Sequence, residues 1–215
     1  MISRIPGLYP GSVFKGHQRS GKSSYPVTVD IKHVDIAESY MCGHLSIGGL
    51  VSDRSLILIL LHQDNFISLL LCLCPQTQEF PVLTTFFEAE IIGPKYSFET
   101  NKWAASHETD QRHWSKFQAF NQHMANFASG SGAEAALSSD HDNVFTFMRW
   151  KELFLVPDHT VRVINGASFA GFYYCCYDAT SCSLHGYYFH TGSELFQSLH
   201  LKPVTSPTSS SHLII

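Results

Sequence analysis

The chain has 215 residues, of which 44% are hydrophobic, 13% aromatic and 15% charged. The charged fraction lies well below the average of about 25%, and this balance predicts one ordered domain. With 14 basic and 18 acidic residues the formal net charge is -4, so the composition favours neither nucleic acid nor an anionic membrane surface as a partner.

Alternation of polar and apolar residues dominates the chain and indicates an antiparallel β barrel or sandwich. The pattern predicts a hairpin from residues 27–31 and 40–47, followed by a long strand over residues 82–92. Apolar and small side chains on one face of that strand are Leu83, Thr85, Phe87, Ala89 and Ile91. Four further strands are predicted over residues 144–149, 152–156, 168–177 and 183–190.

One amphipathic helix is predicted between Ser106 and Ala128, with Ser106 as its N-cap. Large apolar side chains recur there at spacings of three and four and form a stripe that we expect to cover the barrel. The members of the stripe are Trp114, Phe117, Phe120, Met124 and Phe127.

An apolar run over residues 56–74 is long enough to cross a bilayer, but Gln63, Asp64 and Asn65 lie at its middle. A charged side chain at the centre of a membrane helix costs roughly 2.5 to 3.5 kcal/mol, so we expect no transmembrane segment. The first residues also lack the apolar core of a secretory signal. The sequence therefore predicts a cytoplasmic protein.

No motif in the sequence supports catalysis or a cofactor. The six cysteines include adjacent Cys175 and Cys176 and no C-x-x-C pair, which predicts free thiols in place of disulfides or a zinc site. The 13 histidines follow no metal-ligand spacing. We expect no cofactor and no metal.

Glu152 is the most informative acidic residue. In a regular strand it shares a face with Trp150, Phe154 and Val156, where a carboxylate is costly unless a cation or donors meet it. Arg149 or Lys151 could be that cation, although neighbours along a strand point to opposite faces. The alternative is an external amine at the mouth of a barrel, and the periodicity leaves both possibilities open.

Several stretches closely resemble the substrate receptors of the glucose-induced-degradation ubiquitin ligase, which is also called the CTLH complex. The same receptors are known as the vacuolar import and degradation family. The resemblance runs from about Leu8 to Leu201. The stretches that carry it are residues 8–12, 16–18, 83–88, Trp103, 113–117, 147–159, 166–174 and 186–190.

This resemblance implies a mainly β fold, an antiparallel, lipocalin-like barrel with one inserted amphipathic helix. The open end of the barrel would take proteins or peptides with a free N-terminal proline followed by small residues. The chain itself would not catalyse a reaction. It would direct proteins, gluconeogenic enzymes in this family, to ubiquitin-dependent proteasomal or vacuolar degradation, in the cytoplasm, the nucleus or at vesicles.

The resemblance also assigns roles to individual residues. Glu152 would receive the free α-amino group, with Tyr173 and Gln18 as nearby polar contacts. Ser168 and Tyr188 would hydrogen-bond the backbone that follows. The apolar wall around the proline ring would consist of Ile47, Leu50, Leu83 and Phe169.

Compared with the family, the domain over residues 8–201 is interrupted by an apparent insertion at residues 51–76, which we interpret as a retained intron or an error in the gene model. Family members end in an element that docks on an armadillo-repeat scaffold subunit of the ligase. Residues 202–215 depart from that element, so docking is less certain than substrate binding.

Two alternatives come from other functional classes. A lipocalin-like binding protein would hold a small apolar ligand in the same barrel without needing Glu152. A hydrolase would use Ser168 as its nucleophile, but nothing in the sequence brings Asp158 or His159 to that serine.

Overall fold

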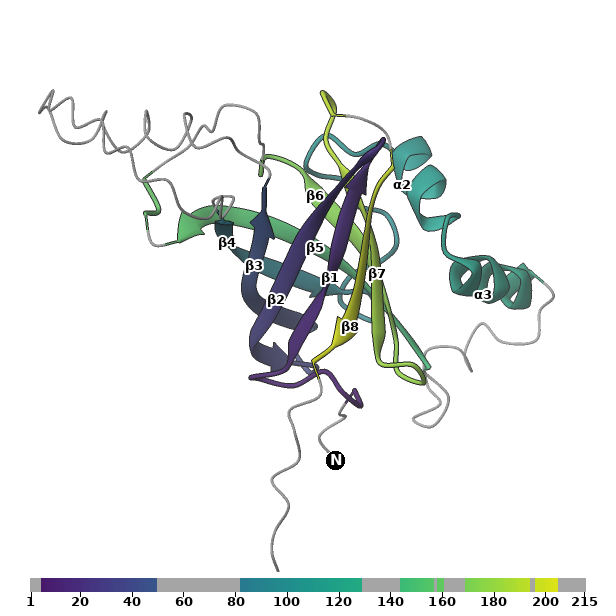
Figure 1. Cartoon of the computed structure of the whole chain (residues 1–215). Helices are drawn as coiled ribbons and strands as arrows, with labels where there is room; N and C mark the ends of the chain where they lie inside the picture. Colours follow the sequence, from purple (N-terminus) through teal and green to yellow (C-terminus); the bar gives the residue numbers. More distant parts are fainter. Residues whose placement is uncertain are drawn as a thin grey trace, which may run out of the picture.

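The computed structural model describes residues 5–49, 82–128, 144–156, 158–160, 169–193 and 196–204. Eight antiparallel strands in these ranges close into one barrel, each paired with the next along the chain and the last with the first (Figure 1). Closure satisfies the backbone groups that an open sheet would expose at its edges. The predicted antiparallel β barrel is confirmed.

Two strands were not predicted, and two predicted strands are one. The strands predicted at residues 144–149 and 152–156 are one strand, β5, while β1 and β8 are additions to the predicted set. The strands are β1 Val13–Ser20, β2 Ser23–Asp35, β3 Tyr40–Gly48, β4 Val82–Ile91, β5 Phe145–Val156, β6 Phe172–Asp178, β7 Ser183–Phe189 and β8 Gln197–Pro203.

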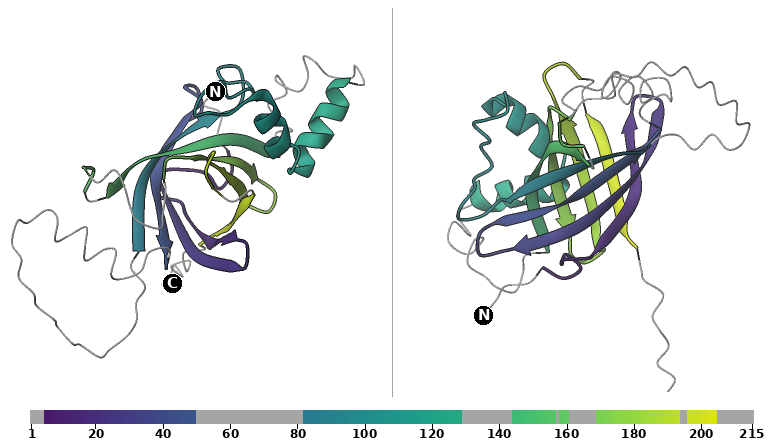
Figure 2. Two further views of the ribbon diagram at one scale, coloured as in Figure 1. Left: turned by 90° about the horizontal axis from the view of Figure 1, so that it is seen from above. Right: turned by 90° about the vertical axis from the view of Figure 1, so that its left-hand side faces the viewer.

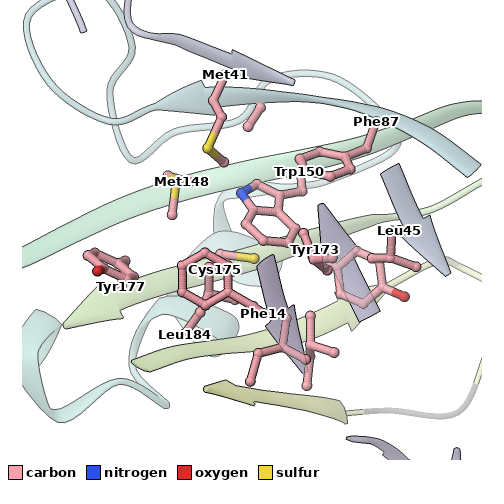
Figure 3. Packing of buried hydrophobic residues seen from close by; sticks show 14 of the residues in the cluster. Phe14, Met41, Leu45, Phe87, Met148, Trp150, Tyr173, Cys175, Tyr177 and Leu184 are labelled. Carbon is pink, nitrogen blue, oxygen red and sulfur yellow. The ribbon is translucent and has the colours of Figure 1, made fainter. Parts of the chain in front are cut away.

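Figure 2 shows the strands wound around the barrel from two further sides. The barrel interior is filled by apolar and aromatic side chains from all eight strands, some of which Figure 3 shows. Phe87 and Trp150 stack with their ring centroids 4.6 Å apart, and Tyr173 and Tyr188 pack at 5.0 Å. Full burial of such a side chain stabilises a fold by roughly 1.5 to 3 kcal/mol. The interior cluster is therefore the main source of stability of the barrel.

Side-chain alternation along β4 follows the prediction. Phe87, Ala89 and Ile91 lie in the interior cluster, and Thr85 is buried on the same face. Along β5 the alternation breaks, because Phe86 pairs with Phe154 whereas the next residue, Phe87, pairs with Glu152. The extra residue on β5, Leu153, forms a β bulge, which reverses the direction of the side chains that follow.

This bulge corrects the prediction that Phe154 and Val156 share a face with Glu152. Trp150 and Glu152 point into the barrel, as expected. Phe154 points outward and stacks on Phe86 at 5.1 Å, and Val156 lies on that outer face as well.

The predicted single helix is two helices, α2 His107–Trp114 and α3 Gln118–Ala128. Ser106 is the N-cap of α2, as predicted, and its side chain accepts a hydrogen bond from the backbone N–H of Thr109. Ser115 ends α2, and tight turns follow in which Lys116 and Phe117 donate to carbonyls three residues earlier.

Part of the predicted aromatic stripe covers the outside of the barrel. Trp114, Phe117 and Phe120 are buried in a second cluster with side chains from the outer faces of β5 and β6. Met124 is 42% exposed and is not part of this cover. The side chain of Phe127 lies outside the described residues.

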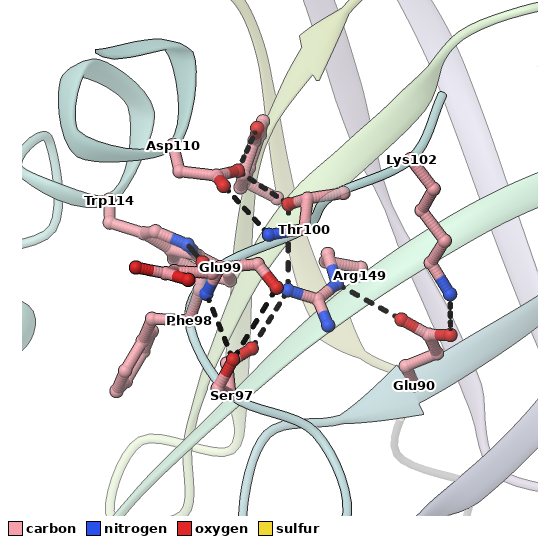
Figure 4. Close-up of polar contacts among 10 residues, drawn as sticks. Glu90, Ser97, Phe98, Glu99, Thr100, Lys102, Asp110, Trp114 and Arg149 are labelled. Carbon is pink, nitrogen blue, oxygen red and sulfur yellow. Dashed lines mark hydrogen bonds and ion pairs between the residues drawn. The ribbon is translucent and has the colours of Figure 1, made fainter. Parts of the chain in front are cut away.

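A polar network fastens this helical region to the barrel wall (Figure 4). Asp110 accepts hydrogen bonds from the backbone N–H of Thr100 at 2.7 Å, from the Thr100 hydroxyl, and from the Tyr174 hydroxyl at 2.6 Å. Arg149, which is 1% exposed, donates to Glu90 at 3.0 Å and to the carbonyl oxygen of Ser97 at 2.9 Å. These bonds satisfy buried charges that would otherwise be costly.

Residues near the amino terminus pack against the end of the barrel where β6 finishes and β7 begins. Leu8 belongs to the interior cluster, and the Tyr177 hydroxyl donates to the carbonyl oxygen of Pro6 at 2.7 Å.

The four described cysteines, Cys42, Cys175, Cys176 and Cys182, are free. Of the helices described, neither is long and apolar enough to span a membrane. The apolar run at residues 56–74 lies outside the described residues.

Candidate functional site

The opposite end of the barrel gathers most of the predicted site residues. Strands β1, β3, β5 and β7 finish there and β2, β4, β6 and β8 begin there, because all neighbours are antiparallel. Six predicted site residues lie at this end: Gln18, Ile47, Leu83, Glu152, Tyr173 and Tyr188. Phe169 lies just before β6. Leu50 and Ser168 are outside the described residues.

Glu152 is a buried carboxylate inside the barrel, 4% exposed. Its Oε1 accepts a hydrogen bond of 2.7 Å from the hydroxyl of Thr85 on β4. Within the described part of the chain it forms no salt bridge. Burial raises the pKa of Glu152 from 4.5 to about 7, against the opposing effects of the Thr85 hydrogen bond and the charge of Lys151. This site therefore favours an added cation.

The two neighbouring cations that could have neutralised Glu152 are engaged elsewhere. Arg149 points to the outer face of β5, where it pairs with Glu90. The ammonium of Lys151 donates to backbone carbonyl oxygens. Neither forms a salt bridge with Glu152, which leaves the external amine as the better-supported of the two possibilities.

A chain of polar side chains crosses the same end of the barrel from β6 to β1 and β8. The Tyr173 hydroxyl donates to Oε1 of Gln18 at 2.7 Å, and Nε2 of Gln18 donates to Oε1 of Gln197 at 3.0 Å. Burial and the charge of Glu152 raise the pKa of Tyr173, so the phenol stays neutral. Its oxygen retains acceptor capacity for a ligand N–H after donating to Gln18.

Apolar side chains accompany these polar groups. Ile47 and Leu83 are direct cross-strand neighbours on β3 and β4, the first buried and the second partly buried. Phe169 is partly buried. Phe87 is the cross-strand neighbour of Glu152 and stacks on Trp150. A compact apolar group beside an ammonium would suit this combination.

Tyr188 has a structural contact at this end as well. Its hydroxyl accepts a hydrogen bond of 2.9 Å from the backbone N–H of Gly171. A Cβ at Gly171 would lie 2.1 Å from the carbonyl oxygen of Phe189 and 2.6 Å from Cζ of Tyr188. Only glycine fits this position, so the segment before β6 is held tightly against β7.

Two residues in contact with the predicted site were missed. Thr85 could have been found, because it shares the inner face of β4 with Leu83. Gln197 gave no signal, because β8 was not predicted and its contact with Gln18 joins the two ends of the chain. Among the described residues, no group of three or more His, Cys, Asp or Glu side chains could hold a metal ion.

Known proteins are similar in sequence to this chain over most of its length. The family described as vacuolar import and degradation protein matches residues 7–66 and 57–204. A mouse protein named glucose-induced degradation protein 4 homolog is 45% identical over 197 residues, which is 92% of this chain and 77% of that protein.

Two fungal relatives carry the name GID complex substrate-recognition subunit 4. The Schizosaccharomyces pombe protein is 31% identical over 215 residues, covering 94% of this chain and 93% of that protein. The Saccharomyces cerevisiae protein is 29% identical over 246 residues, covering 91% of this chain and 62% of that protein.

Proposed function

Since the chain belongs to the vacuolar import and degradation protein family, we propose that it is a substrate-recognition subunit of a GID-type ubiquitin ligase. It would bind proteins by a free N-terminal proline and would not itself catalyse ubiquitin transfer. The names of the mouse and fungal relatives support the assignment to this ligase. Gluconeogenic enzymes are the targets that the family resemblance suggests, with degradation by the proteasome or the vacuole.

The observation that carries the proposal is the carboxylate of Glu152, buried in the barrel with Thr85 as its hydrogen-bond donor and without a salt bridge in the described residues. An α-amino group has a pKa of about 7.7 to 8.0 and is largely protonated at neutral pH. At about 4 Å and an effective dielectric of about 20, the pair gains roughly 4 kcal/mol before desolvation.

The roles proposed for the other residues are those that the family resemblance assigns. The Tyr173 hydroxyl and the Gln18 amide would contact the same ammonium from β6 and β1, while Tyr188 and Ser168 would bind the backbone that follows. Ile47, Leu83, Leu50 and Phe169 would enclose the proline ring. The site would then recognise a charge and a compact ring together, and a blocked amine would be rejected.

We also propose that residues 51–76 are extra to the domain of residues 8–201, as a retained intron would be. The division of the family match within this stretch supports the proposal, because its two segments, residues 7–66 and 57–204, break there and overlap at residues 57–66. Sequencing the mature transcript tests it. An uninterrupted junction of the codons for Leu50 and Thr77 is expected, and a uniform transcript that carries the insertion would exclude the intron.

Assembly into the ligase would use the armadillo-repeat scaffold subunit, in the cytoplasm, the nucleus or at vesicles. Copurification of the full chain with that subunit tests this part. Retention of the scaffold is the expected result, and its absence would show that residues 202–215 do not replace the docking element of the family.

The binding proposal is tested with the full chain and three fluorescent peptides that share one sequence. The first begins with free proline, the second is its acetylated twin, and the third carries a methionine before the proline. Fluorescence polarisation should show binding of the first, with affinity for the other two at least about a hundredfold weaker. Equal binding of all three would instead favour a carrier of apolar ligands.

A further inference from the structure

Lys151 is a cation held by backbone oxygens. Its Nζ donates hydrogen bonds to the carbonyl oxygens of Glu152 at 2.8 Å, Phe169 at 3.1 Å and Gly171 at 3.0 Å. An ammonium has three N–H donors, so these bonds use all of them. Its cross-strand neighbour Glu88 forms no salt bridge with it among the described contacts and instead accepts from Tyr40.

The three carbonyls join two parts of the candidate site. One belongs to Glu152 itself on β5, and the others belong to the segment that leads into β6 and contains Phe169. On its other side Gly171 donates to the Tyr188 hydroxyl at 2.9 Å. The peptide groups around Gly171 are therefore held between Lys151 and β7, with no room for a side chain.

Lys151 lies on the opposite face of β5 from Glu152. It pairs in register with Phe172, which packs in the cluster outside the barrel, whereas Glu152 pairs with Phe87 inside. Its ammonium thus stands behind the carboxylate, away from the interior where a ligand would enter. It can act on a ligand only through Glu152 and through the segment at 169–171.

We propose that Lys151 is a positioning residue of this site. It fixes residues 169–171 against β5 and places a positive charge behind the Glu152 carboxylate, which favours the ionised form of that group and so the binding of an ammonium. This inference rests on the proposed function for its consequence in binding, but its effect on Glu152 is independent of any ligand.

The surroundings of Glu152 make this charge important. From β4 the carboxylate meets Thr85, which donates a hydrogen bond, and Phe87, which is apolar. From β6 it meets Tyr173, whose raised pKa keeps the phenol neutral, and Tyr188 on β7 packs against that ring. Of the described residues, Lys151 is the cation whose charge lowers the pKa of Glu152, against burial that raises it to about 7.

A titration of the free protein tests the electrostatic part. The carboxyl ¹³C signal of Glu152 is followed by NMR in the wild type, in Lys151→Met and in Lys151→Arg. Lys151→Met should raise the midpoint by about one pH unit, and Lys151→Arg should leave it nearly unchanged. An unmoved midpoint in a folded Lys151→Met variant would overturn the proposal.

Peptide affinity as a function of pH tests the consequence for binding. A free-proline peptide is titrated from pH 6 to pH 8.5, with Lys15→Met on the exposed face of β1 as a matched control. For Lys151→Met the loss of binding towards acidic pH should begin about one pH unit higher, with about fivefold weaker binding at pH 7. The Lys15→Met curve should match the wild type.

A purely structural role gives a different result. Affinity would then fall by the same factor at every pH, and the pH at which binding begins to weaken on the acidic side would not change. This result would refute the charge effect. Near-UV circular dichroism checks that each variant is folded, and Lys151→Gln, which also removes the charge, replaces Lys151→Met if that variant unfolds. If the wild-type protein does not prefer the free over the acetylated peptide, the proposed function is refuted. The NMR titration would still test the effect of Lys151 on the pKa of Glu152, because it needs no ligand.

Discussion

The Thr85 hydroxyl donates a 2.7 Å hydrogen bond to Oε1 of Glu152, which ties a buried carboxylate on β5 to the neighbouring strand β4. The bond orients the carboxyl group inside the barrel but does not neutralise it. A charge-assisted hydrogen bond of this kind contributes roughly 1.5 to 3 kcal/mol, less than the desolvation of an ionised carboxylate costs. An ionised Glu152 therefore lowers the free energy of unfolding of the barrel.

Glu152→Gln should stabilise the free protein above neutral pH. With the pKa raised from 4.5 to about 7, the unfolded chain loses its proton between these values while the folded protein keeps it, so stability falls as pH rises through this window. The variant should gain roughly 3 kcal/mol at pH 8 and little at pH 4.5, measured by urea unfolding. Glu108→Gln, at an exposed position on α2, is the control and should change stability by no more than about 0.5 kcal/mol. A Glu152→Gln protein that is less stable than the wild type at pH 8 would contradict this account.

Tyr173→Phe should weaken binding of a free-proline peptide about tenfold, because it removes an acceptor and releases the Gln18 side chain from its 2.7 Å hydrogen bond. Its unfolding free energy should fall by about 1 to 2 kcal/mol. Tyr187→Phe is the matched control for affinity, because Tyr187 pairs with Tyr174 and lies on the outer face of β7. If both variants bind as tightly as the wild type, Tyr173 does not contribute to the site.

Asp110→Asn should destabilise the fold without changing the site. The carboxylate accepts from the backbone N–H and hydroxyl of Thr100 and from Tyr174, and an amide N–H₂ would face at least one of these donors. We expect a loss of about 2 to 4 kcal/mol in the free energy of unfolding, with peptide affinity retained at temperatures where the variant is folded. A loss below about 0.5 kcal/mol would show that the helical region is not fastened by this network.

His113 should make the protein sensitive to acid. It is 1% exposed, stacks on Tyr174 at 4.7 Å, and has an Nδ1 that lies 2.7 Å from the carbonyl oxygen of Thr109. Burial lowers its pKa below 6.5, so the unfolded chain binds a proton more readily and stability falls as pH drops below 6.5. His113→Phe keeps the ring stack and should show a smaller decrease of Tm between pH 7 and pH 5. His107→Phe, at an exposed position on the same helix, should show the wild-type decrease; equal behaviour of the two variants would exclude this role.

The sequence predicts those features that depend on local periodicity. The inner face of β4, the hairpin of β2 and β3 and the Ser106 cap follow from spacing and residue type. The strand β1 was missed because Gly16 and Gln18 occupy positions on its inner face, where the pattern calls for apolar side chains. Such irregularities are common where a barrel carries polar groups for binding.

Long-range features could not be read from the same patterns. The bulge that turns Phe154 outward depends on how β5 registers with β4, and a single sequence does not specify that register. The contact of Gln18 with Gln197 joins residues 179 positions apart. Family resemblance supplied the members of the candidate site, while the hydrogen bonds of Thr85 and Lys151 emerged only from the structure.

The central claim is that Glu152 receives the α-ammonium of a substrate. A thermodynamic cycle tests it most directly, with the wild type and Glu152→Gln each titrated against the free-proline peptide and its acetylated twin. The account predicts strong coupling: acetylation should cost the wild type at least about a hundredfold in affinity and should cost Glu152→Gln less than about threefold. Equal losses on acetylation in both proteins would show that Glu152 and the amine act independently, and this would contradict the account.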